Sequence, residues 1–78
     1  MFYFQKLLKE NYIKRTEMVS YLGLSLPAYK RRLDKTNDFT LNELEDMKMF
    51  FVKRNIVGVN FDIGDFLNEV EETKKWKT

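Results

Sequence analysis

Hydrophobic residues recur at helical spacing through most of the 78-residue chain. Spacings of three and four residues predict helices over about residues 3–11, 17–22, 26–33, 41–55 and 62–73, because such positions share one face of an α-helix. The residues expected on the buried faces are, in chain order, Phe4, Leu7, Leu8 and Tyr12; Met18, Val19 and Leu22; Tyr29 and Leu33; Leu41, Leu44, Met47, Phe50 and Phe51; and Ile63, Phe66, Leu67 and Val70.

Capping residues separate these segments. Thr16 and Ser25 are expected N-caps, since their hydroxyls can accept a hydrogen bond from a free N–H of the first turn. Pro27 fits the first turn of the third helix, where no intrahelical N–H is needed. Gly23 is expected to end the second helix, because glycine adopts the positive φ of a tight turn. Residues 40–43, TLNE, match a capping box that opens the fourth helix.

The region after the fourth helix is less regular. Residues 56–61 alternate between apolar and polar side chains, which suits either a short strand or a loop. Asp62 is the expected cap of a last helix over residues 62–73. No repeat or Gly/Ser-rich linker interrupts the chain, which favours one unit. We therefore predict a compact all-α domain of four to five helices over residues 1–78, with its core in 3–55 and the 62–73 helix as an appendage.

The missing residue types limit the chemistry. The sequence has no Cys and no His, which excludes a disulfide framework, a zinc finger and the commonest general base. We therefore expect no enzyme, no cofactor and no metal. The carboxylates Glu43, Glu45 and Asp46 are expected on a solvated surface, because adjacent helix positions point in different directions. No stretch has the length and apolarity of a signal peptide or a membrane span, so a cytoplasmic location is expected.

Charge is distributed unevenly along the chain. The formal net charge is only +2. Residues 1–37, however, carry eight basic and three acidic side chains, a net of +5, whereas residues 38–78 carry six basic and nine acidic ones, a net of −3. A basic half can bind phosphates, while an acidic half must face away from them or meet a different partner.

Residues 15–34 carry the strongest functional signal, two short predicted helices joined by the Gly23 turn. In such a pair the second helix can project from the surface, and the major groove of DNA, about 12 Å wide, accepts one α-helix. Its expected outward cations are Lys30 and Arg31, followed by Arg32 and Lys35 at its end. Arg can bind guanine through two hydrogen bonds, whereas Lys more often meets a phosphate. The alternative is a solvated helix end, where cations also favour the helix dipole.

Three stretches resemble a known family. Residues 16–25, TEMVSYLGLS, followed by 29–34, YKRRLD, resemble the lambda-repressor-like helix–turn–helix domains of phage Cro and repressor proteins. Residues 38–44, DFTLNEL, resemble the segment that opens the fourth helix in small phage-encoded members. The resemblance covers about residues 4–51, and it implies a DNA-binding regulator.

The chain also departs from the family pattern. Arg15 stands where the family favours Gln, and Val19 stands where it favours Ala, so the helix packing is expected to open slightly. The positions that often read bases in the family are Leu26 and Pro27 here, which can meet only thymine methyl groups or sugar. Hydrogen-bonded readout would then rest on the cations of the same helix.

Charge and resemblance together imply a sequence-specific transcriptional regulator, a repressor-like protein that binds double-stranded DNA with residues 26–33 in the major groove. Residues 26–31 would enter the groove, and the remaining contacts, together with Lys14, would meet phosphates. The residues expected to contact DNA are Arg15, Thr16, Ser25, Leu26, Pro27, Lys30, Arg31, Lys35, Thr36 and Asn37.

A second hypothesis is a protein-interaction module, an anti-repressor or modulator that keeps this fold but binds a protein partner. The apolar Leu26-Pro27 pair and the acidic half of the chain motivate it. The C-terminal apolar residues are candidates either for the core or for an exposed patch that meets a second copy in a homodimer. They are Phe61, Phe66, Val70 and Trp76.

Overall fold

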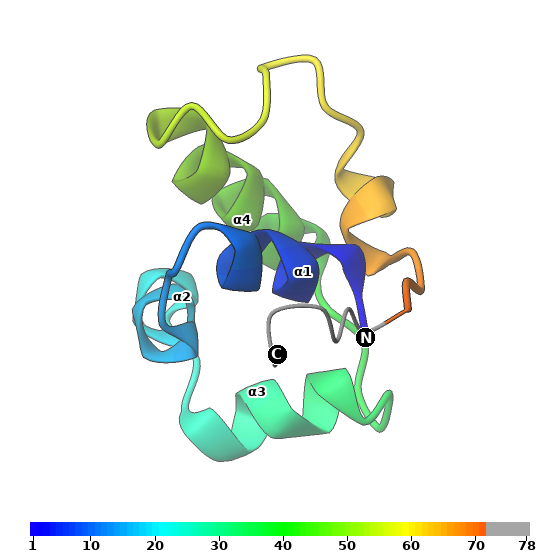
Figure 1. Cartoon of the computed structure of the whole chain (residues 1–78). Helices are drawn as coiled ribbons and strands as arrows, with labels where there is room; N and C mark the ends of the chain where they lie inside the picture. Colours follow the sequence, from blue (N-terminus) through cyan, green and yellow to red (C-terminus); the bar gives the residue numbers. More distant parts are fainter. Residues whose placement is uncertain (72–78) are drawn as a thin grey trace, which may run out of the picture.

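The computed structural model describes residues 1–71, which contain four α-helices and one short 3-10 helix (Figure 1). They are α1 (Tyr3–Glu10), α2 (Arg15–Leu22), α3 (Leu26–Leu33), α4 (Leu41–Lys53) and η1 (Ile63–Leu67). Within residues 1–71 the β pairing is limited to an isolated antiparallel bridge between Phe2 and Glu69. The predicted all-α fold is confirmed. None of the described helices is long and apolar enough to cross a membrane.

The end of α2 and the starts of α3 and α4 form as the sequence predicts. The Ser25 hydroxyl accepts a hydrogen bond from the Ala28 N–H at 3.2 Å, and Pro27 lies in the first turn. Gly23 ends α2 with a φ of +72°, in the left-handed region that glycine adopts without a steric penalty. Thr40 and Glu43 exchange the two hydrogen bonds of a capping box, at 3.1 and 3.0 Å. These local bonds fix where α3 begins and how it follows α2.

Two details before α3 differ from the expectation. Thr16 does not cap α2, because the helix begins one residue earlier, at Arg15, with Lys14 as its N-cap. Tyr12, which was expected on the buried face of the first helix, instead takes a positive φ of +57° in the turn after α1, where the Asn11 side-chain amide donates to the Leu7 carbonyl at 2.8 Å. The turn carries Tyr12 off the helical face, and its side chain is 95% exposed.

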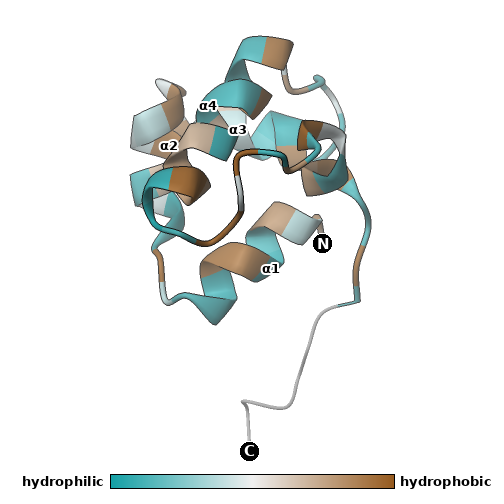
Figure 2. Ribbon diagram, turned by 90° about the horizontal axis from the view of Figure 1, so that it is seen from above, coloured by the Kyte–Doolittle hydropathy of each residue, from teal (hydrophilic) through white to brown (hydrophobic). Residues whose placement is uncertain are grey.

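Aromatic side chains dominate the core. The rings of Phe4 and Tyr29 meet edge to face at 6.4 Å, and the rings of Phe51 and Phe66 lie 5.5 Å apart. Helix α2 packs on α4, and η1 packs against both α1 and α4. Hydrophobic and hydrophilic residues accordingly alternate around the helices, as α1 illustrates (Figure 2). The buried residues are Phe2, Phe4, Leu7, Leu8, Met18, Val19, Leu22, Tyr29, Phe39, Met47, Phe50, Phe51 and Phe66.

Leu41 was expected on the buried face of α4 but is exposed. Leu41 is the first residue of α4, directly after the Thr40 cap. The core contact of α4 begins further along the helix, with residues such as Met47.

The region after α4 differs most from the sequence prediction. Residues 56–62 form turns and a loop with no strand. Asp62 caps the next segment through the Gly64 N–H, but over residues 62–71 that segment contains a 3-10 helix of five residues in place of the expected α-helix, whose last two residues, 72 and 73, lie outside the described part. Residues beyond it pair with the N-terminus instead: the Tyr3 N–H donates to the Asn68 carbonyl at 2.8 Å. Because Phe66 is fully buried, this region belongs to the core rather than to an appendage.

Candidate nucleic-acid interface

Helix α3 lies along one edge of the molecule, below α1 in the view of Figure 1. Its inward face is anchored by Tyr29, which is 1% exposed, and by the half-buried Leu33. Lys30 and Arg31 are exposed, and neither forms an ion pair with any residue in 1–71. Among the described residues, α3 therefore carries two cations without ion-pair partners on a helix that Tyr29 anchors in the core.

The start of α3 presents apolar groups to solvent. Leu26 is exposed by 38%, and Pro27 beside it is exposed as well. The Ser25 hydroxyl accepts a hydrogen bond from the Ala28 N–H, and its own O–H and second lone pair remain for another contact. This end of the helix can make apolar contacts and a hydroxyl contact, while charged contacts come from the next turn.

Arg15 and Thr16 lie in the first turn of α2 and are exposed, next to the exposed Lys14 cap. Burial raises the pKa of Tyr29 to about 12, and the positive charge of Arg15 acts in the opposite direction on that phenol. Both residues line a hollow of about 280 Å³ between α1, α2 and α3. The structure therefore brings Arg15 of α2 next to the inner side of α3.

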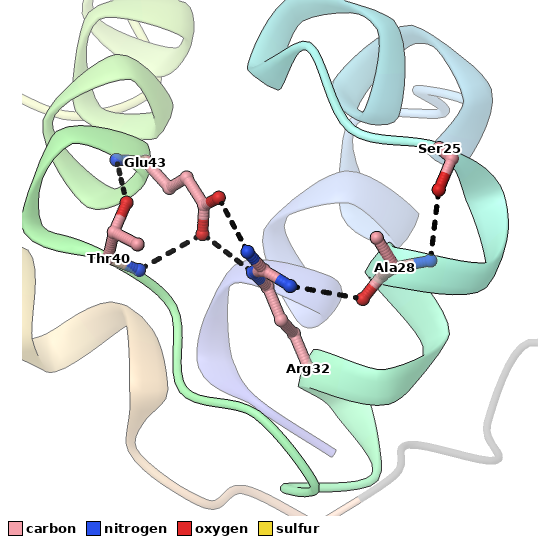
Figure 3. Close-up of polar contacts among 5 residues, drawn as sticks. All are labelled: Ser25, Ala28, Arg32, Thr40 and Glu43. Atoms are coloured by element: carbon pink, nitrogen blue, oxygen red, sulfur yellow. Dashed lines mark hydrogen bonds and ion pairs between the residues drawn. The ribbon is translucent and has the colours of Figure 1, made fainter.

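Arg32 does not face outward, contrary to the expectation. Its guanidinium donates to both oxygens of the Glu43 carboxylate, from Nε to Oε1 at 2.7 Å and from Nη2 to Oε2 at 2.9 Å (Figure 3). The same side chain reaches the Ala28 carbonyl at 3.5 Å. Arg32 and Glu43 are only 15% and 12% exposed, so Glu43 is not a solvated carboxylate either. The sequence separation of the pair explains why the sequence pattern did not reveal it.

The cations after α3 are more constrained than the sequence indicated. Lys35 has a φ of +63°, and its Nζ lies 2.6 Å from the Glu69 Oε2. Thr36 and Asn37 are exposed, but their backbone N–H groups both donate to the Arg31 carbonyl, at 2.9 and 3.3 Å. Their side chains remain the groups that a phosphate could meet. Lys35 is already engaged.

The C-terminal apolar residues had two predicted roles, in the core or in an exposed patch for a second copy. Phe66 is fully buried and therefore belongs to the core. Phe61 is half-buried, with its ring stacked 6.1 Å from that of Tyr3, and Val70 is half-buried too. Trp76 lies outside the described residues.

A separate groove of about 580 Å³ runs between α4 and the loop at residues 59–63. Its apolar lining includes Met49 and Val59, which are 47% and 70% exposed. Glu45, Lys48 and Asp62 supply the charged part of the lining. No group of acidic side chains within residues 1–71 has the arrangement of a metal site.

Comparisons of the chain with protein-family models, with curated proteins and with solved structures find no match.

Proposed function

We propose that this protein is a sequence-specific, DNA-binding transcriptional regulator of the phage Cro/repressor type. In this proposal α3 enters the major groove, and the first turn of α2 lies over the phosphates. The observation that carries it is the pair Lys30 and Arg31, which are exposed on a helix at the edge of the domain and form no ion pair with any residue in 1–71. Lys14 and Arg15 add positive charge on the neighbouring helix end.

The contacts divide by chemistry. Arg31 carries the fork of donors that matches guanine O6 and N7, so it is assigned base readout. Lys30 is assigned a phosphate. Leu26 and Pro27 offer only apolar contact, which suits thymine methyl groups.

Rigid support favours this role. Tyr29 holds α3 from inside the core, and the Arg32–Glu43 ion pair ties the same helix to α4. A helix that is held on two sides loses little conformational entropy on binding, so more of the contact energy is retained as affinity. One α3 covers few base pairs, and tight binding therefore calls for a second copy on a half-site about 34 Å away.

Fluorescence anisotropy of a labelled duplex from the upstream DNA of the native locus tests the proposal. Arg31→Ala should weaken binding by about 1–3 kcal/mol and relax discrimination at one base pair. Lys48→Ala removes one positive charge from α4, away from α3, and is the matched control, with a much smaller expected effect. The proposal fails if the wild-type protein shows no salt-dependent binding to any such duplex.

A protein-interaction module is the second candidate, and the groove beside α4 favours it. Exposed apolar side chains at Met49 and Val59 lie next to the carboxylates of Glu45 and Asp62. This chemistry suits a peptide segment with one large apolar side chain flanked by Lys or Arg.

Titration with a synthetic amphipathic Lys/Leu peptide, followed by NMR of the Met49 methyl group, tests this candidate. Val59→Asp should abolish the methyl shift, because it places a charge in the apolar groove. Tyr12→Asp, at an exposed site outside the groove lining, is the control and should leave it unchanged. A methyl signal that does not respond to the peptide in the wild type eliminates the groove as such a site.

A further inference from the structure

Lys35 is held by residues from both ends of the described chain. Its ammonium lies 2.6 Å from the Glu69 carboxylate and 5.6 Å from the centre of the Phe2 ring. Lys35 directly follows the basic helix α3 and its cap Asp34, at the edge of the surface assigned to phosphate contacts. The cation is therefore partnered in the absence of any ligand.

The backbone fixes the position of Glu69. On one side, the Tyr3 N–H donates to the Asn68 carbonyl at 2.8 Å, and on the other the Val70 N–H donates to the Met1 carbonyl at 2.8 Å. Glu69 itself forms the bridge with Phe2. Its carboxylate is consequently presented to Lys35 by a short extended segment whose backbone is already ordered.

We propose that residues 68–71 act as an autoinhibitory strap, in which the Glu69 carboxylate occupies Lys35 and must release it before a DNA phosphate can bind there. This inference rests on the proposed DNA-binding function. The exposed Glu71 adds a second negative charge to the same strap.

The strap competes effectively because it is intramolecular. The strap becomes ordered when the domain folds, so Glu69 is held next to Lys35 at a high effective concentration. A DNA phosphate must displace the Glu69 carboxylate to reach Lys35. A carboxylate at this position also repels the approaching DNA backbone. Since phosphate contacts carry no sequence information, the strap lowers affinity for all duplexes alike and leaves sequence preference unchanged.

Anisotropy titrations with a specific and an unrelated duplex test the strap in the full-length chain. Glu69→Gln keeps the shape of the side chain and removes its charge. It should raise affinity about threefold to fivefold for both duplexes, the range of an exposed ion pair. The slope of log K against log salt concentration should also steepen by about 0.9, the value for one additional phosphate contact.

Two controls separate competition at Lys35 from a general change of charge. Glu45→Gln makes the same charge change on α4 and should alter affinity by less than about twofold. Glu69 also lies 3.7 Å from the amino group of Met1. In a Lys35→Met background Glu69→Gln should therefore have no effect if the competition is at Lys35. Circular dichroism of each variant confirms that it folds.

The outcomes are distinct. If the wild type binds DNA but Glu69→Gln behaves like Glu45→Gln, or keeps its effect in the Lys35→Met background, the strap is overturned and the proposed function stands. If neither the wild type nor any variant binds DNA, the proposed function fails and the inference fails with it.

Discussion

Arg32 and Glu43 connect α3 to α4 through two parallel hydrogen bonds, of 2.7 and 2.9 Å, between a guanidinium and a carboxylate. Glu43 also accepts the Thr40 N–H at 3.0 Å, so one carboxylate both caps α4 and holds α3. A charge-assisted pair with two bonds fixes orientation as well as distance. The orientation of α3 relative to α4 therefore depends on this contact.

Arg32→Met should lower the free energy of unfolding by about 1–3 kcal/mol, because Glu43 is left partly buried without its counter-charge. Urea unfolding followed by circular dichroism measures the change. Arg31→Met, one residue earlier on the exposed side of α3, is the control, with an expected change within about 0.5 kcal/mol. Equal losses for the two variants would contradict a role for the pair.

Stability should fall in acid in a manner that depends on Arg32. Burial of the Glu43 carboxylate raises its pKa, but the hydrogen bonds from Arg32 and Thr40 outweigh that effect and leave the pKa below its ordinary value. A pKa that is lower in the folded state gives stability that is present above the unfolded value, about 4.3, and is lost as the pH falls through the folded value. The difference in unfolding free energy between wild type and Arg32→Met should therefore narrow as the pH falls below about 4.3, as measured by urea titrations at several pH values. A difference that stays constant across that range contradicts the assignment.

Gly23→Ala should destabilise the domain by about 1–2 kcal/mol, because an L side chain at a positive φ clashes with its own backbone. A Cβ at Gly23 would meet no other atom within 4 Å, so the cost comes from the backbone conformation alone. Gly58→Ala is the matched control: space is open there as well, and its φ is not in the left-handed region. Thermal unfolding should separate the two variants, and similar melting temperatures would argue against strain at the α2–α3 turn.

Phe66→Ala should cost about 3–5 kcal/mol, the range for removal of a large side chain from a packed core. The ring contacts Phe61 and Phe51 at centroid distances of 4.6 and 5.5 Å. Val59→Ala, at a side chain that is 70% exposed, should change stability by less than about 0.5 kcal/mol. Chemical denaturation measures both. A small loss for Phe66→Ala would show that the core ends at α4.

Lys30→Ala should weaken binding to all duplexes similarly and reduce the salt slope by about 0.9, the effect of one lost phosphate contact. Anisotropy titrations at several salt concentrations measure the slope. Lys48→Ala again serves as the equal-charge control. If Lys30→Ala instead relaxed discrimination at a single base pair, the assignment of Lys30 to a phosphate would be wrong.

Features that depend on near neighbours were predictable from the sequence. The Ser25 cap, the Gly23 turn and the Thr40–Glu43 capping box each involve bonds or backbone angles within three residues, and all three formed as expected. The start of α3 follows directly from the Gly23 turn and the Ser25 cap. Local chemistry therefore placed the helix that carries the candidate site.

Contacts between distant residues were not predictable in the same way. Arg32 and Glu43 each matched a common surface pattern, and only the approach of α3 to α4 pairs them. The helical spacing over residues 62–73 was equally suggestive, yet residues 68–70 pair their backbone with the N-terminus. Helical periodicity cannot show that these residues will pair with the N-terminal segment instead of forming a helix, because that segment is distant in the sequence.

The pairing of the two ends also sets the order in which the domain can be completed. Met1 and Val70 are 69 positions apart and exchange backbone hydrogen bonds in both directions. Residues of lower number leave the ribosome first, so Phe2 and Tyr3 emerge long before their later partners, the bridge residue Glu69 and the ring of Phe61. Until those partners are synthesised, the start of the chain exposes apolar rings. Chaperones and proteases can bind the nascent chain there, and completion of the domain buries the site.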